Sequence, residues 1–172
     1  DFVPKYDSTV VERLDKAGAI LLGKLNLTEG AMGGYNPKRQ VPKNPWDTTK
    51  WSGSSSSGSG ASTAAGLCFG SLGSDTGGSI RYPSSACGTV GLKPTYGRVS
   101  RYGVLDLAPS LDHVGPMTRT VNDAWTMFNA IEGFDPKDPT TVKRDSDEVI
   151  NHLDKSNIII GYDDHYASDG VN

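Results

Sequence analysis

The stretch that decides the fold runs from Ser52 to Arg81 and reads SGSSSSGSGASTAAGLCFGSLGSDTGGSIR. Two loops rich in serine and glycine flank a short apolar segment in it. Residues 61–67 are compatible with a helix and residues 68–73 with a strand, so both loops are expected at the same end of one packed helix–strand unit. The second loop, residues 74–88, can open a further short helix. We therefore expect the two loops to form a site.

The segment before this stretch predicts elements of a layered α/β domain. Residues 7–17 place apolar side chains at helical spacing, with Asp7 or Ser8 as the cap and Gly18 after the last turn. The compact apolar run 19–24 (AILLGK) is interpreted as a buried strand. Asn26 or Thr28 is expected to cap a turn, and residues 35–50 form a long surface loop held down by Trp46.

Further elements follow the stretch. Residues 89–93 predict a strand, and residues 94–103 a turn-rich excursion. Residues 105–119 carry buried-looking Leu, Val and Met side chains between prolines. Residues 122–131 repeat apolar side chains with a 3.6-residue period and predict a helix that Gly133 ends. Residues 135–156 are interpreted as a linker or surface helix, and residues 157–162 (NIIIGY) as a late strand.

The composition excludes several classes of function. The chain has 172 residues, a length that fits one domain with its own core. The 21 glycines among 172 residues exceed the usual glycine share of about 7%, and this excess predicts many tight turns. A net charge of -3 provides no basic surface for direct binding of nucleic acid, so a small or neutral ligand is the better expectation.

The cysteines and the first residues give expectations about the cellular compartment and about whether the chain is a fragment. Cys68 and Cys87 lie among small or apolar neighbours, without the spacing of a metal site. We expect two buried thiols in a reducing, cytoplasmic compartment, and neither a metal nor a cofactor. No apolar run is long enough for a membrane span. Residues 1–4 (DFVP) look neither like a signal peptide nor like a natural start, which predicts a processed piece or a fragment.

Several kinds of functional loop are rich in serine and glycine, and most of their sequence motifs do not match this chain. A flexible linker is the plainest interpretation of residues 51–62 alone, but the second loop that follows argues against it. The glycines match neither a phosphate-binding P-loop nor GxGxxG. The triplet Asp75-Thr76-Gly77 resembles the aspartic-protease DTG, yet the sequence has no second copy. A lipase elbow would require glycine where Arg81 stands.

Ser79 is left as a candidate nucleophile. It follows Thr76, Gly77 and Gly78, and consecutive backbone N–H groups around two glycines can converge on one oxygen, as a tetrahedral acyl intermediate requires. The histidines stand in no recognisable triad context, so a base built from another serine and a lysine is considered. The three histidines of the sequence are His113, His152 and His165.

These residues resemble the amidase signature family. The match rests on GSSSSGSGASTAAG at 53–66 and LGSDTGGSIRYPSSACGTVGLKPTYGRVS at 72–100, with supporting similarity at 8–34 and 107–124. The resemblance implies an α/β fold in which a mixed β-sheet core is covered by helices on both faces. Residues 1–172 would be a partial domain that lacks an upstream strand with the catalytic lysine and a C-terminal portion.

The resemblance also implies roles for individual residues. Ser79 is similar to the nucleophile that forms the acyl-enzyme, and Ser55 to the bridging serine, which follows a cis peptide bond. The backbone of Thr76, Gly77, Gly78 and Ser79 would form the oxyanion hole. Asp75 and Arg81 resemble a pair that stabilises the loop. The residues alone favour the same structural ion pair, because a carboxylate held by arginine has a lowered pKa and is a poor general base.

Four further positions and the upstream lysines bear on the resemblance. Met32 and Gly33 could line the acyl pocket, although ordinary loop packing is the better expectation, because methionine fills irregular gaps readily. Ser54 and Ser57 stand where the family usually has glycine. The lysine of the triad would lie before residue 1. The upstream lysines stand in the wrong sequence context for that role and are Lys5, Lys16, Lys24 and Lys50.

Three functions remain open at this point. The leading one is hydrolysis of a small carboxylic amide to the acid plus ammonia or an amine, through a Ser-cisSer-Lys triad and without a cofactor. The second is the glutamine-hydrolysing A subunit of a tRNA-dependent amidotransferase, with that enzyme's other subunits as partners. The third is a non-catalytic remnant whose loops shape a pocket or an interface. A homodimer is a further expectation for the first function.

Overall fold

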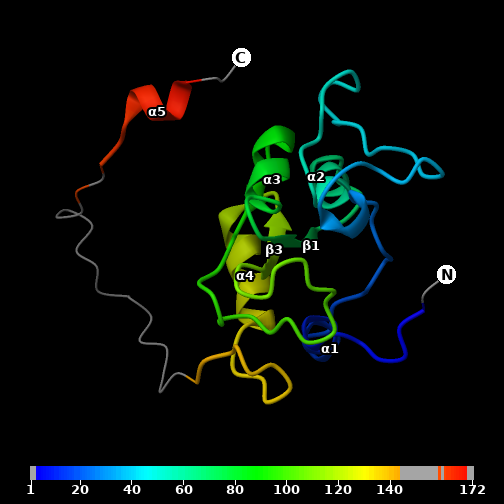
Figure 1. The fold of residues 1–172 in the computed structure, drawn as a ribbon, viewed down its shortest axis with the longest axis vertical. Helices are drawn as coiled ribbons and strands as arrows, with labels where there is room; N and C mark the ends of the chain where they lie inside the picture. Colours follow the sequence, from blue (N-terminus) through cyan, green and yellow to red (C-terminus); the bar gives the residue numbers. More distant parts are fainter. Residues whose placement is uncertain (1–2, 144–158, 160, 170–172) are drawn as a thin grey trace.

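The computed structural model describes residues 3–143, 159 and 161–169. The elements follow the order α1 (Thr9–Lys16), η1 (Glu29–Ala31), α2 (Ser57–Ala64), β1 (Gly70–Asp75), α3 (Arg81–Cys87), β2 (Val90–Gly91), β3 (His113–Thr118), α4 (Val121–Ile131) and α5 (Asp164–Ser168). Helices and a small sheet share the core region (Figure 1). The α/β class predicted from the sequence is confirmed.

The three strands form an antiparallel sheet in the order β1-β3-β2. β1 pairs with β3 from Gly70 opposite Thr118 to Asp75 opposite His113. The short β2 pairs Val90 with Thr118. The central strand β3 therefore holds together β1 and β2, the strands that precede and follow α3.

Helices cover both faces of this sheet, as predicted. Successive residues of a strand point to opposite faces. On one face, Leu72 and Val114 pack into a core that α1 and α4 complete with Val10, Phe128 and Ile131. On the other face, the Ser71 hydroxyl lies 2.9 Å from the Thr63 hydroxyl of α2. The serine and glycine loops thus continue from elements that are fixed on the sheet.

The predicted helices 7–17 and 122–131 are confirmed as α1 and α4. The Thr120 side chain accepts a hydrogen bond from the Asp123 N–H at 3.1 Å and so caps the start of α4. At the other end, Arg13 of α1 donates to the carbonyl oxygens of Ile131 and Gly133, at 2.7 and 3.1 Å. Arginine there suits the partial negative charge of a helix C-terminus, and this contact joins α1 to α4.

The central stretch is more helical than its composition predicts. Helix α2 begins at Ser57, inside the predicted loop, and β1 lies two residues later than expected. Gly58 lies against the backbone of residue 26: a Cβ atom at Gly58 would come within 2.2 Å of the Asn26 oxygen. The Gly58 N–H donates to that oxygen at 2.9 Å. Glycine here is what allows the helix to approach the preceding chain so closely.

The predicted buried strand 19–24 is wrong. These residues are coil, and Ile20 is 85% and Leu22 74% exposed. Strand formation requires a neighbouring strand to pair the backbone N–H and C=O groups, and no strand among the described residues pairs with this segment. An apolar run favours a buried strand, but the run by itself does not supply the neighbouring strand with which it would have to pair.

Two further interpretations are corrected. Strand β3 lies in a segment for which only buried side chains were expected, and Val114 and Met117 are indeed buried there, while Leu105 and Leu111 are exposed. Asp135 and Asp138 are buried and hydrogen-bonded, so the start of segment 135–156 is not a surface linker. Residues 144–158 and 160, and with them half of the predicted strand 157–162, lie outside the described residues.

The long loop 35–50 is held down by Trp46, as predicted. The Trp46 indole N–H donates to the Cys87 carbonyl oxygen at 2.7 Å, at the end of α3. Asn44 supports the same junction with a 2.7 Å hydrogen bond to the Ala86 carbonyl oxygen. The loop is therefore tied to the helix that follows the second serine and glycine loop.

Candidate functional site

The first serine loop carries Ser55 in a buried position. Ser55 is 1% exposed, and its hydroxyl has no hydrogen-bond partner among the described residues. The peptide bond between Ser54 and Ser55 is cis, which agrees with the resemblance. Gly53 has φ +79°, and a Cβ there would lie 2.4 Å from the Pro83 Cα. The path of this loop therefore requires glycine at 53.

In the structure the second loop is shorter than predicted and spans residues 76–80, because β1 extends to Asp75 and α3 begins at Arg81. Gly78 has φ +143°, a conformation that favours glycine. The backbone N–H groups of Gly77, Gly78 and Ser79 donate to no acceptor within the described part of the chain. Ser79 is half-buried and stands two residues before α3. Unpaired N–H groups beside a serine are what an oxyanion site requires.

The two loops meet, as the sequence predicts. The Ser56 N–H donates to the Ser79 carbonyl oxygen at 3.3 Å. The Ser56 hydroxyl accepts from the Ser74 N–H at 3.2 Å and donates to the Ser74 carbonyl oxygen at 3.3 Å. Ser56 was not singled out from the sequence, yet it joins the two loops through their backbones. Ser55 and Ser79 are thereby brought to one region.

The predicted ion pair between Asp75 and Arg81 is present. Arg81 binds the carboxylate with both Nε and Nη2, at 2.9 and 3.1 Å. The N–H groups of Ile80 and Arg81 each donate to the same carboxylate at 3.3 Å. Asp75 is fully buried. This one carboxylate fixes the end of the second loop at the start of α3.

The electrostatics of Asp75 agree with a structural role. Burial opposes the charged form of this carboxyl, but hydrogen bonds from the Arg81 side chain and from the Arg81 and Ile80 N–H groups outweigh it and lower the pKa. Lys93, which the sequence did not point to, lies 3.7 Å from the carboxylate. Asp75 therefore stays ionised and is a poor general base.

His113 lies at the edge of this region. Its Nδ1 lies 2.6 Å from the Leu111 carbonyl oxygen and 3.3 Å from that of Asp75, and its ring packs edge-on against Tyr96. His165 is in α5, and His152 lies outside the described residues. The structure thus pairs His113 with backbone oxygens of the chain.

Met32 does not fill a gap in the packing. Its side chain is 75% exposed, and a Cβ at Gly33 would meet no atom within 4 Å. The Thr28 N–H donates to the Ser55 carbonyl oxygen at 3.4 Å, which holds the turn before Met32 beside the first loop. The expectation of ordinary loop packing is therefore wrong for Met32 in this structure, and its contribution to a substrate pocket stays a prediction.

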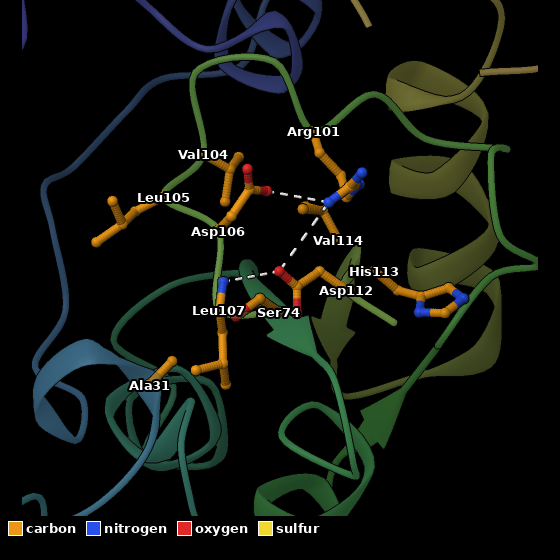
Figure 2. Close-up of a pocket in the computed structure, with 10 residues that line it drawn as sticks. All are labelled: Ala31, Ser74, Arg101, Val104, Leu105, Asp106, Leu107, Asp112, His113 and Val114. Atoms are coloured by element: carbon orange, nitrogen blue, oxygen red, sulfur yellow. Dashed lines mark hydrogen bonds and ion pairs between the residues drawn. The ribbon is translucent and has the colours of Figure 1, made fainter. Parts of the chain in front are cut away.

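A small cavity lies next to the end of β1, under the segment 104–107 (Figure 2). Its volume is about 10 Å³, enough for one water molecule at most and too small for a substrate. Asp112 and Arg101 point into it with Val104 and Leu107 (Figure 2). The cavity belongs to the support of the site and not to the place where a substrate binds.

Other site classes find no support in the described residues. Within them, no group of three or more His, Cys, Asp or Glu side chains is placed to hold a metal ion. Across the same part of the chain, no helix is both long and apolar enough to cross a membrane. Cys87 is buried and Cys68 half-buried, and both are free thiols. Burial raises the pKa of the Cys87 thiol.

Comparisons with known proteins agree with this arrangement. The family model for amidases matches residues 1–171. A putative amidase, AmiD, from Mycobacterium tuberculosis is 61% identical over 140 residues, which are 81% of this chain and 30% of that protein. The A subunit of the glutamyl-tRNA(Gln) amidotransferase from Maridesulfovibrio salexigens is 49% identical over 176 residues, 99% of this chain and 36% of that protein.

Solved structures show the same fold. The A subunit of the glutamyl-tRNA(Gln) amidotransferase from Thermotoga maritima gives a TM-score of 0.76 at 49% identity, over 81% of this chain and 31% of that one. Native peptide amidase from Stenotrophomonas maltophilia gives 0.76 at 42%, over 78% and 29%. The chain spans about a third of the length of these relatives. It belongs to the amidase signature family.

Proposed function

We propose that the protein containing this chain hydrolyses a carboxylic amide through an acyl-enzyme on Ser79, with Ser55 as the bridging serine. The observation that carries the proposal is the buried Ser55 hydroxyl, which finds no partner in the part of the chain that the structure describes and lies beside the loop that presents Ser79. A buried hydroxyl without a partner costs about 1–3 kcal/mol. A hydroxyl that transfers protons between two groups recovers this cost when both groups are in place.

The reaction follows from these positions. The Ser79 Oγ attacks the amide carbonyl carbon while its proton passes to the Ser55 Oγ, and the Ser55 proton passes to a neutral lysine amine. The carbonyl oxygen becomes an oxyanion, and the free N–H groups of residues 77–79 stabilise it. The C–N bond then breaks, and the protons return along the same path to the leaving amine. Water hydrolyses the ester on Ser79 and releases the acid.

The lysine is proposed to come from the part of the protein before residue 1. Lys93 pairs with the Asp75 carboxylate at 3.7 Å and not with the Ser55 hydroxyl, which has no partner among the described residues. Residues 1–172 alone should therefore be inactive. Turnover by this piece at the rate of the intact protein would contradict the proposed triad.

A second candidate function is the A subunit of a tRNA-dependent amidotransferase, in which glutamine is the amide. The similarity to that subunit over 99% of the chain supports it. The two functions use the same serines and differ in partners. Mass spectrometry of proteins that co-purify with the intact protein separates them: stoichiometric further subunits support the amidotransferase, and their absence together with turnover of simple amides supports the free amidase.

The test of the shared chemistry is labelling of the intact protein with a fluorophosphonate probe. We expect one covalent adduct, on Ser79, that disappears in Ser79→Ala and forms at least about 100-fold more slowly in Ser55→Ala. Ser85→Ala is the matched control, because Ser85 is exposed on α3 and should leave labelling unchanged. No adduct on Ser79 in the folded, intact protein would support a non-catalytic remnant instead.

A further inference from the structure

Asp112, the residue before β3, joins the second loop to the segment 104–108. Its Oδ1 accepts a 2.5 Å hydrogen bond from the Thr76 hydroxyl. Its Oδ2 accepts from the Leu107 and Ala108 N–H groups, at 2.8 and 2.9 Å, and lies 4.0 Å from Arg101 (Figure 2). Asp112 is 7% exposed. Hydrogen bonds to a buried carboxylate are the stronger kind, and here both oxygens are used.

Thr76 is the point where this carboxylate reaches the second loop. The loop leaves β1 at Thr76 and enters α3 after Ile80. Gly77 and Gly78 have no side chains that could hold it in place. Asp75 holds the far end through the N–H groups of Ile80 and Arg81. The bond between Thr76 and Asp112 is a side-chain contact at the near end, next to those of Ser56 with the Ser74 backbone and of His113 with the Asp75 carbonyl oxygen.

We propose that Asp112 is a positioning residue for the oxyanion site, acting through the Thr76 hydroxyl. The inference rests on the proposed function, because it concerns the N–H groups that would bind the oxyanion. Two carboxylates then hold the two ends of one loop, Asp75 from β1 and Asp112 from the segment before β3. The loop 104–108 supports Asp112 in turn.

The direct test removes the Thr76 hydroxyl and keeps the shape of the side chain. In the intact protein, Thr76→Val should lower kcat for an amide substrate by about 10-fold or more with little change in KM, because the displaced N–H groups act in the transition state. Thr76→Ser restores the hydroxyl and should stay within about 2-fold of the unaltered protein. A Thr76→Val protein with unchanged kcat would overturn the proposal.

A double-mutant cycle assigns the effect to Asp112. Asp112→Ala should lower kcat at least as much as Thr76→Val, and the double variant should be no worse than Asp112→Ala alone, since both remove the same contact. Effects that multiply would overturn the proposal and indicate two separate structural roles. Melting temperatures are measured for all four proteins, so that loss of folding is recognised. Asp106→Ala is the control, because the exposed Asp106 pairs with Arg101 at 3.0 Å in the same loop.

Failure of the inference can be told from failure of the proposed function. If the unaltered intact protein neither hydrolyses amides nor reacts with a fluorophosphonate, the proposed function is wrong. In that case, crystal structures of the unaltered and Thr76→Val proteins still test whether Asp112 positions the second loop through Thr76. Displacement of residues 76–79 in the variant supports the role of Asp112, and an unmoved loop overturns it.

Discussion

Replacing Asp75 with asparagine should destabilise the intact protein by about 2–3 kcal/mol. Asp75 is fully buried and accepts four hydrogen bonds, two from the Arg81 side chain and two from backbone N–H groups. Asparagine retains one acceptor oxygen, so its NH2 group must face a donor. Breaking a buried ion pair costs about 3–5 kcal/mol when the remaining charge stays buried.

The expected cost lies below that range for a reason visible in the structure. The Arg81 side chain is 53% exposed, so its charge can turn to water when its partner is lost. What remains is the loss of hydrogen bonds to a charged acceptor, worth about 1.5–3 kcal/mol. Chemical denaturation followed by tryptophan fluorescence measures the change in unfolding free energy. Asp106→Asn is the control, with a 55% exposed side chain and an expected change under about 0.5 kcal/mol. An equally small effect of Asp75→Asn would show that the buried carboxylate does not stabilise the loop.

Three further perturbations probe charge, packing and burial. Acid should destabilise the protein below about pH 4, because the carboxyls of Asp75, Asp135 and Asp138 have lowered pKa values in the folded state. Their contribution is present above the unfolded pKa and is lost as the pH falls through the folded one; a melting temperature that stays constant from pH 6 to 3 would contradict this. Gly58→Ala should cost about 2 kcal/mol or more, since its Cβ would lie 2.2 Å from the Asn26 oxygen, whereas Gly34→Ala meets no atom within 4 Å and should be near neutral in denaturation. Cys87 should react with iodoacetamide far more slowly than Cys68, because burial raises its pKa, and mass spectrometry at pH 8 that finds equal rates would disprove this.

Local sequence patterns predict those helices and loops whose structural determinants all lie within one short segment. Helices α1 and α4 are predictable because their apolar spacing and the glycines after them lie within one segment, and the same holds for Trp46 as the residue that fastens its loop. The meeting of the two serine loops follows from the helix–strand order between them. Asp75 and Arg81 are paired correctly because they are six residues apart on one loop.

Other features depend on residues distant in sequence. Strand β3 contains Pro116, which argues against a strand, yet its pairing with β1 tolerates proline opposite Leu72. The run 19–24 has the apolar character of a strand but no partner in the described chain. Asp112 can be recognised only when folding places it beside Thr76, 36 residues away. No spacing rule connects these two positions, so their contact cannot be predicted from local patterns.

The proposed chemistry makes Ser79 the nucleophile and Ser55 the serine that relays its proton. The most direct measurement is the site and rate of fluorophosphonate labelling in the intact protein, compared among the unaltered, Ser55→Ala and Ser85→Ala forms. The account predicts a single adduct on Ser79, formed at least about 100-fold more slowly without the Ser55 hydroxyl and at the normal rate without that of Ser85. An adduct on another residue, or equal rates in all three forms, would contradict it.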